Sequence, residues 1–162
     1  PSPPPPSPPP SPPPPQPPSP PPPPPPPPSD NSGLLFVKTQ LGDPGELVSW
    51  SGVDPCGSAW MRVTCTSGSV TGVDLSFLSV PVGTGIPAAL GTLYGLRSIQ
   101  LNGNGLTGGL ISALSGLSAL TSLRLDNNAL TGSLPTSWSA LSNLLTLNLG
   151  TNQLTGPVPT EW

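Results

Sequence analysis

The chain has 162 residues and 30 prolines, and 23 of these prolines lie within the first 28 positions, so that segment has nothing apolar with which to build a core. All apolar residues fall in the rest of the chain, where they make up about 40%, an ordinary share for one compact domain. Four Lys or Arg against seven Asp or Glu give a net charge of −3, and aromatic residues make up 4%. This composition excludes a basic nucleic-acid or membrane surface, and the chain has no apolar run long enough to span a bilayer.

The sequence contains no histidine, which removes the commonest general base and metal ligand. Two carboxylate pairs are the nearest candidates for catalysis, Asp43 with Glu46 and Asp74 with Asp126. The sequence shows neither an aromatic-lined cleft nor sugar-positioning residues beside them. We therefore expect no enzyme activity, no metal and no cofactor. The chain starts at Pro1 with neither Met nor a signal-like segment, which we interpret as a mature or partial chain.

The first segment, PSPPPPSPPPSPPPPQPPSPPPPPPPPP, offers almost no backbone N–H groups, so only polyproline II is available to it. At about 3.1 Å per residue it would form a semi-rigid rod of about 87 Å. A ligand for SH3-type or WW-type grooves is the alternative, but the first cation that could serve as its anchor is Lys38. We interpret residues 1–29 as a spacer rod.

The Ser-Pro-Pro-Pro-Pro units of this rod resemble extensins and the hydroxyproline-rich glycoproteins of plant and green-algal walls. The resemblance implies hydroxylated prolines with O-linked glycans of the arabinose or galactose type. No asparagine stands in an N-linked acceptor sequence, so glycans are expected on the rod. The candidate modification sites are Pro3, Pro4, Pro5, Pro6, Pro8, Pro9, Pro10, Pro12, Pro13, Pro14, Pro15, Ser2, Ser7, Ser11 and Ser19.

A repeat with a 24-residue period follows: LTSLRLDNNALTGSLP from Leu120 recurs as LLTLNLGTNQLTGPVP from Leu144, and an earlier copy starts at Leu96. A degenerate copy from Val70 has Leu78 where the others have Asn. The pattern resembles plant-type leucine-rich repeats. It implies a short solenoid of about four repeats over residues 70–162, with parallel β-strands and an irregular or 3-10 convex side. The repeated asparagines, Asn104, Asn128 and Asn152, are expected to form a ladder that satisfies backbone groups.

Residues 30–69 resemble the N-terminal cap of the same family, with an α-helix around residues 34–41 and with Trp50 and Trp60 in the cap core. Cys56 and Cys65 are expected to form a disulfide, the alternative being two buried free thiols. The family motif has Gly-Val after the tryptophan. Here Met61-Arg62-Val63 follows Trp60, so we expect a different loop at this point.

The outward strand positions predict a small, polar concave face. Its candidate binding residues are Asp74, Ser98, Gln100, Asn102, Ser122, Arg124, Asp126, Thr146 and Asn148. The alternative is a plain solvated face, with Arg124 and Asp126 joined in a salt bridge. No C-terminal cap is visible after the last repeat, so Leu154, Val158 and Trp162 are expected to form an apolar assembly end. Truncation or processing of the chain is the competing explanation for that end.

Two functions follow. The first is a structural glycoprotein of the extracellular matrix or cell wall, which associates with itself head to tail in a fibre and contacts wall glycans or glycoproteins. The second is a receptor-like or inhibitor-like recognition module that binds a peptide, protein or glycan and is carried on a glycosylated stalk. Both place the chain outside the cell, and neither involves a nucleic acid or a transmembrane segment.

Overall fold

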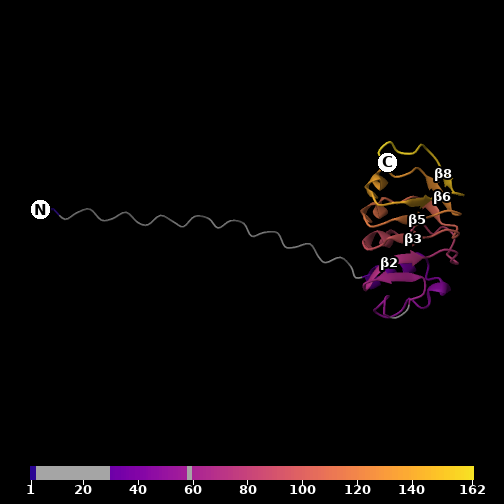
Figure 1. Ribbon diagram of the computed structural model, residues 1–162, viewed down its shortest axis with the longest axis horizontal. Helices are drawn as coiled ribbons and strands as arrows, with labels where there is room; N and C mark the ends of the chain where they lie inside the picture. Colours follow the sequence, from indigo (N-terminus) through magenta and orange to yellow (C-terminus); the bar gives the residue numbers. More distant parts are fainter. Residues whose placement is uncertain (3–29, 58–59) are drawn as a thin grey trace.

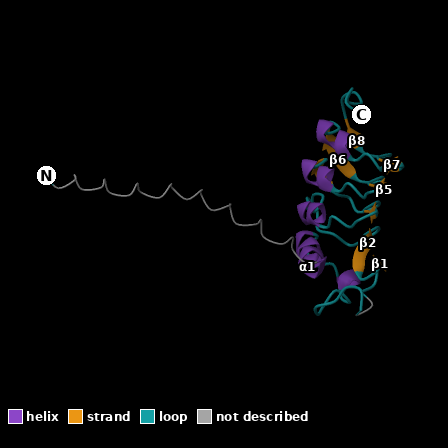
Figure 2. Ribbon diagram, turned by 60° about the vertical axis from the view of Figure 1, so that its left-hand side comes forward, coloured by secondary structure: helices purple, strands orange, loops and turns teal. Residues whose placement is uncertain are grey.

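The computed structural model describes residues 1–2, 30–57 and 60–162. Within these ranges, short strands from successive turns of the chain stack side by side to form a solenoid (Figure 1). Short 3-10 helices lie on the side away from the strands (Figure 2). The predicted rod lies outside the described residues except for Pro1 and Ser2.

The element order starts with a cap and continues with three similar turns. The cap and first strands are α1 (Asp30–Gln40), η1 (Gly45–Leu47), β1 (Val63–Thr66) and β2 (Ser69–Asp74). The repeats that follow contain η2 (Ala88–Thr92), β3 (Ser98–Gln100), β4 (Thr107–Gly109), η3 (Ser112–Gly116), β5 (Ser122–Arg124), β6 (Ala129–Gly132), η4 (Thr136–Ala140), β7 (Thr146–Asn148) and β8 (Gln153–Leu154). No helix of the described part is long and apolar enough to cross a membrane.

The strands form two sheets, one of five strands in the order β1-β2-β3-β5-β7 and one of three strands in the order β4-β6-β8. All pairs are parallel except β1 with β2. The register places Ile99 beside Leu123 and Leu123 beside Leu147, which is the sequence period. The middle residue of each three-residue strand points inward because side chains alternate between the two faces of a sheet.

The inward leucines form one continuous core, and most of them have no exposed surface. Leu123, Leu125 and Leu130 are each 0% exposed, because turns of the chain cover them on both sides. Their equivalents in the last turn, Leu147 and Leu149, are only half-buried. Burial therefore depends on having a neighbour on each side, as expected for a solenoid.

The predicted asparagine ladder is confirmed. Asn128 Nδ2 donates to the carbonyl oxygens of Leu101 (3.0 Å) and Leu125 (2.9 Å), and its Oδ1 accepts from the backbone N–H of Asn104 (3.1 Å) and Leu106 (2.9 Å). Asn104 and Asn152 make equivalent donations to two backbone carbonyls. Each amide thus joins two successive turns, where the chain leaves the strand and no sheet partner remains for these groups.

The cap helix α1 covers the inner face of the first turn. Leu34 and Val37 are fully buried, and a Cβ at Gly33 would lie 2.6 Å from Leu93 Cδ2, so this glycine allows the helix to approach η2 closely. Asp30 Oδ2 accepts a hydrogen bond from the backbone N–H of Val70 (2.8 Å), which ties the start of α1 to β2. The helix begins at Asp30, before the predicted residue 34.

The cap core is the predicted pair of tryptophans. Trp50 and Trp60 stack with ring centroids 5.7 Å apart and are 1% and 2% exposed. Their indole N–H groups donate to the carbonyls of Met61 (2.7 Å) and Ser51 (2.9 Å), so both buried donors are satisfied. The predicted disulfide between Cys56 and Cys65 is present, with the Cα atoms 5.7 Å apart.

The loop after Trp60 contains a residue in an unusual backbone conformation. Arg62 has φ 68°, a left-handed conformation that favours glycine. Its guanidinium Nη1 donates to the carbonyl oxygens of Asp74 (3.3 Å) and Ser76 (3.0 Å). These two hydrogen bonds offset the backbone strain and connect the cap to the loop that leaves β2.

Replacement of Asn104 by alanine should destabilise the fold by about 3 kcal/mol, because it leaves buried backbone groups of Leu75, Leu78 and Leu101 without their partner. Asn152→Ala is the matched control. It removes the same side chain from the half-exposed last turn, and about 1 kcal/mol is expected because water can reach that site. Urea denaturation monitored by tryptophan fluorescence measures both. Equal losses would contradict the proposed role of burial in the ladder.

The carboxylate of Glu46 links the cap to the first repeat and should make stability depend on pH. Hydrogen bonds from its own backbone N–H and from the Ser79 hydroxyl lower the pKa of Glu46. A lowered folded-state pKa adds stability above the unfolded pKa, and this stability is lost as pH falls through the folded value. The melting temperature should therefore fall less between about pH 5 and pH 3 in Glu46→Gln than in the wild type. Parallel melting curves would contradict this expectation.

Candidate functional site

The outward residues of the five-stranded sheet form two straight rows across the repeats, and we call this surface the sheet face. Because the parallel strands are in register, equivalent residues stand beside one another. The first row contains Gly72, Ser98, Ser122 and Thr146, and the second contains Asp74, Gln100, Arg124 and Asn148. The structure thus brings together seven of the nine predicted concave-face residues in two rows of small and polar side chains.

Asn102 and Asp126 do not lie in these open rows, and the prediction that their side chains point outward is wrong. Each is only 6% exposed. The strands end at Gln100 and Arg124, and the chain then turns, so strand alternation no longer places these side chains outward. Asn102 Oδ1 and Asp126 Oδ1 are buried atoms without a hydrogen-bond partner among the described residues.

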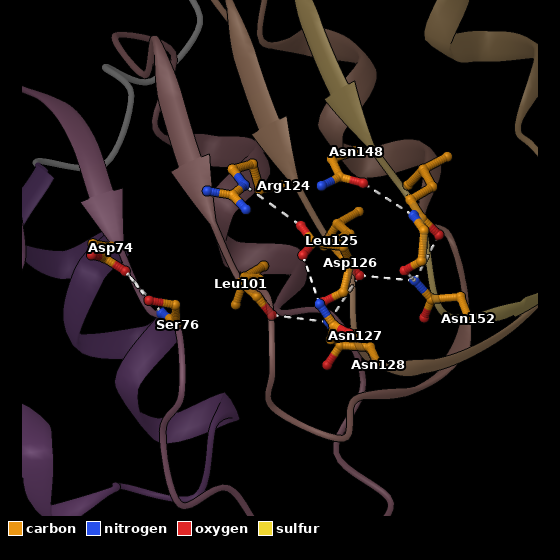
Figure 3. A network of polar contacts seen from close by, with 12 residues as sticks. Asp74, Ser76, Leu101, Arg124, Leu125, Asp126, Asn127, Asn128, Asn148 and Asn152 are labelled. Carbon is orange, nitrogen blue, oxygen red and sulfur yellow. Dashed lines mark hydrogen bonds and ion pairs between the residues drawn. The ribbon is translucent and has the colours of Figure 1, made fainter.

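Asp126 instead forms part of a polar network at the end of β5 (Figure 3). Its Oδ1 lies 3.5 Å from Arg124 Nε, as the sequence predicts for this pair, and its Oδ2 accepts from Asn127 Nδ2 at 2.8 Å. On the next strand, Asn148 Oδ1 accepts from the backbone N–H of Gly150 (3.2 Å). The charge of Arg124 is therefore balanced within its own repeat.

Asp74, at the other end of the sheet face, is balanced in the same manner. Its Oδ1 accepts from the backbone N–H of Ser76 (3.0 Å) and lies 3.9 Å from Arg62 Nη1 (Figure 3 shows the contact with Ser76). Both aspartates of this region are thus held by an arginine of the same chain. The two rows present hydroxyl and amide groups with little net charge.

A third row of side chains, at the N-terminal ends of the strands, was not predicted from the sequence. It contains Thr71, Arg97, Thr121 and Leu145, which precede the first outward residue of successive strands. The 24-residue frame contains the signal that identifies them, since residues 97, 121 and 145 share one repeat position. Strand alternation alone does not mark Arg97, Thr121 and Leu145 because they lie just outside the strands, whereas Thr71 lies within β2.

Arg97 stands between two hollows along this row. One hollow of about 510 Å³ is lined by Arg97, Ser118, Ala119, Thr121, Ser142, Asn143 and Leu145. The other, of about 230 Å³, is lined by Thr64, Thr71, Gly72, Val73, Asp74, Arg97, Ser98 and Gln100. Gly72 contributes to the second hollow because it leaves the first row without a side chain at this strand.

The chemistry of these hollows is that of a binding surface. Their lining contains hydroxyl, amide and guanidinium groups and a single carboxylate, Asp74. Across the described ranges, no group of three or more Cys, Asp or Glu side chains gathers in a way that could hold a metal ion. Such a surface can donate and accept hydrogen bonds along an extended chain.

The predicted assembly end has one feature that the sequence analysis missed. Trp162 is the repeat equivalent of Trp138 and stacks on it, with ring centroids 6.2 Å apart and an interplanar angle of 16°. The indole N–H of Trp138 donates to the carbonyl of Ile111, and that of Trp162 donates to the carbonyl of Pro135, one repeat later. Val158 remains 64% exposed and Leu154 is half-buried.

An apolar hollow of about 370 Å³ adjoins this tryptophan pair, and its lining includes Leu141, Leu144 and Leu147.

The predicted modification sites from Pro3 to Ser19 lie outside the described residues. Of the modification sites, only Ser2 is described, and it is exposed.

Comparison with known proteins supports this architecture. Residues 27–66 match the leucine rich repeat N-terminal domain, and residues 95–117 and 119–141 match the Leucine Rich Repeat. Leucine-rich repeat protein FLOR 1 from Arabidopsis thaliana is 36% identical over 74 residues, which cover 46% of this chain and 22% of that protein. The chain therefore spans only a small part of the length of this relative.

Solved structures with the same fold include plant ectodomains. The ectodomain of the Arabidopsis receptor kinase HAESA, in complex with an IDA peptide hormone ligand, is 36% identical with a TM-score of 0.72, over 82% of this chain and 22% of that one. The Arabidopsis thaliana BIR3–SERK2 complex is 28% identical with a TM-score of 0.57, over 80% and 85%. A plant ice-binding protein is 29% identical with a TM-score of 0.58, over 82% and 51%.

Proposed function

We propose that this chain, which carries a leucine-rich-repeat N-terminal domain and leucine-rich repeats, is a recognition module that binds a peptide or an extended protein segment on its sheet face. One observation carries the proposal: two in-register rows of small and polar side chains cross four parallel strands beside two hollows. The similarity to an ectodomain in complex with a peptide hormone supports it. The fold alone does not support the proposal, because an ice-binding protein has a similar fold.

The dimensions of the sheet face suit a short extended segment. Adjacent strands lie about 4.8 Å apart, so the four strands from β2 to β7 span about 14 Å, the length of about four extended residues. The polar rows would hydrogen-bond the backbone of such a segment, and the hollows beside Arg97 would receive its side chains. The balanced charges of Asp74 and Arg124 mean that little net charge faces the ligand at these two positions.

The module is proposed to work outside the cell. The disulfide between Cys56 and Cys65 is typical of an oxidising compartment, and the similar solved structures include ectodomains. The extensin-like residues 1–29, with O-linked glycans, would serve as its stalk in a cell wall or surface matrix. The module has no proposed enzyme activity or cofactor.

Self-association into a fibre is a second candidate function. Its support is the apolar hollow beside Trp138 and Trp162 together with the exposed Val158 at the same end of the stack. A further repeat packed on this end would cover the same surface. Analytical ultracentrifugation of the glycosylated chain and of Val158→Asp tests this second candidate. If the chain self-associates, its sedimentation coefficient rises with protein concentration, and Val158→Asp reduces that rise. A chain that acts only as a recognition module sediments as a monomer at every concentration.

The recognition proposal is tested by selecting binders from a display library of random linear peptides. Ser122→Trp fills the centre of the first row and should weaken binding of a selected peptide more than tenfold by steric exclusion. Thr131→Trp is the matched control, because it places the same bulk on an exposed position of β6 in the other sheet. We expect it to bind as the wild type does, with both variants checked by thermal melting.

Failure to select any peptide would overturn the proposal. Equal losses in Ser122→Trp and Thr131→Trp, with both variants folded, would move the binding site away from the sheet face.

A further inference from the structure

We propose that Arg97 is a specificity-determining residue that binds one acidic side chain of the peptide ligand. The inference rests on the proposed function and adds the chemical class of ligand residue that the hollows beside β3 select. The Asp or Glu side chain would lie over the guanidinium, between the two hollows that Arg97 separates.

Among the Lys and Arg side chains, all four of which lie in the described ranges, Arg97 is the one without a carboxylate partner. Lys38 Nζ lies 3.0 Å from Asp43 Oδ1, and Arg62 and Arg124 pair with the two aspartates near the sheet face. The residues outside the described ranges contain no Asp or Glu, so every acidic side chain of the sequence is accounted for. The Arg97 guanidinium is exposed and makes no ion pair with any of them.

The backbone of Arg97 is fixed on both sides while its side chain remains free. Its N–H donates to the carbonyl of Thr71 (2.7 Å), and its carbonyl accepts from the N–H groups of Thr121 (2.8 Å) and Ser122 (3.0 Å). The Thr121 hydroxyl donates to the same carbonyl at 2.9 Å. The base of the side chain is therefore held in place before a ligand arrives, which lowers the ordering cost of binding.

The surroundings of Arg97 favour a carboxylate. The larger hollow has no acidic residue in its lining, and the carboxylate of Asp74 in the smaller hollow is already paired with Arg62. The hydroxyl and amide groups of Ser118, Thr121 and Asn143 could hydrogen-bond the atoms around the carboxylate. A planar guanidinium matches the two oxygens of a carboxylate in geometry as well as in charge.

The charge of the whole chain limits the ligand to few acidic groups. With a net charge of −3, the protein repels a polyanion at long range, and a single unpaired arginine neutralises one carboxylate. The ligand is thus a largely neutral peptide with one acidic side chain at a defined position. Nucleic acid and highly charged polysaccharide fit this surface poorly.

The test selects peptides blocked at both ends, so that Asp and Glu side chains supply the only carboxylates. Wild type, Arg97→Gln and Lys38→Gln, each as the full chain, are used to select from the same library. Lys38→Gln is the matched control, because it removes the same charge from α1, and Lys38 does not line either hollow. We expect enrichment of Asp or Glu at one peptide position with the wild type and Lys38→Gln, and loss of this enrichment with Arg97→Gln.

A selected peptide then provides a double-mutant cycle. Replacing its acidic residue by the neutral amide should weaken binding to the wild type about fivefold, and Arg97→Gln should weaken binding of the original peptide about equally. The two changes together should cost no more than either alone, because both remove the same contact.

Peptides selected without acidic enrichment, or acidic enrichment that persists in Arg97→Gln, would overturn this inference and leave the proposed function standing. Additive losses in the cycle would also overturn it. The absence of any selected peptide would overturn the proposed function and this inference together.

Discussion

An asparagine side chain at one position of the last three repeats joins successive turns of the solenoid. After each inward strand, the chain turns toward the opposite side of the solenoid, where its N–H and C=O groups have no sheet partner. Asn104, Asn128 and Asn152 supply partners for these groups in their own repeat and in the preceding one. Because each amide joins two turns, the leucine core and the register of the strands both depend on the ladder.

The first turn lacks this asparagine, and the cap replaces it with several weaker contacts. Leu78 occupies the equivalent position, and its N–H donates to Asn104 Oδ1 of the next repeat. Arg62 and Glu46 then hold the loop that leaves β2 from the cap side. The cap therefore closes the apolar end of the solenoid and also fixes the first strand of the sheet face.

The sheet face combines strands in register with balanced charge, and the proposed recognition of a peptide rests on this combination. Arg124 and Asp126 pair within one repeat, and Asp74 pairs with Arg62 of the cap, so most of the polar surface is neutral. The unpaired Arg97 is the residue that we propose to distinguish a charged ligand residue from a neutral one. The surface around Trp162 is different in kind, because the Trp162 indole stacks on Trp138 and donates its N–H to the carbonyl of Pro135 in the preceding repeat.

The sequence by itself determined the repeats, the strand register, the ladder and the pairing of Cys56 with Cys65, because a 24-residue period forces equivalent residues to stack and the cap resembles a known family. Strand alternation also predicted nine face residues, and seven of these lie in the two rows of the sheet face. Only the tertiary structure decided that Asn102 and Asp126 are buried, because alternation stops where the strand ends and the direction of the turn is set by neighbouring repeats. The same holds for Arg97. Arg97 has no ion pair because each aspartate near the sheet face pairs with another arginine. The antiparallel pairing of β1 with β2 brings Arg62, rather than Arg97, to Asp74.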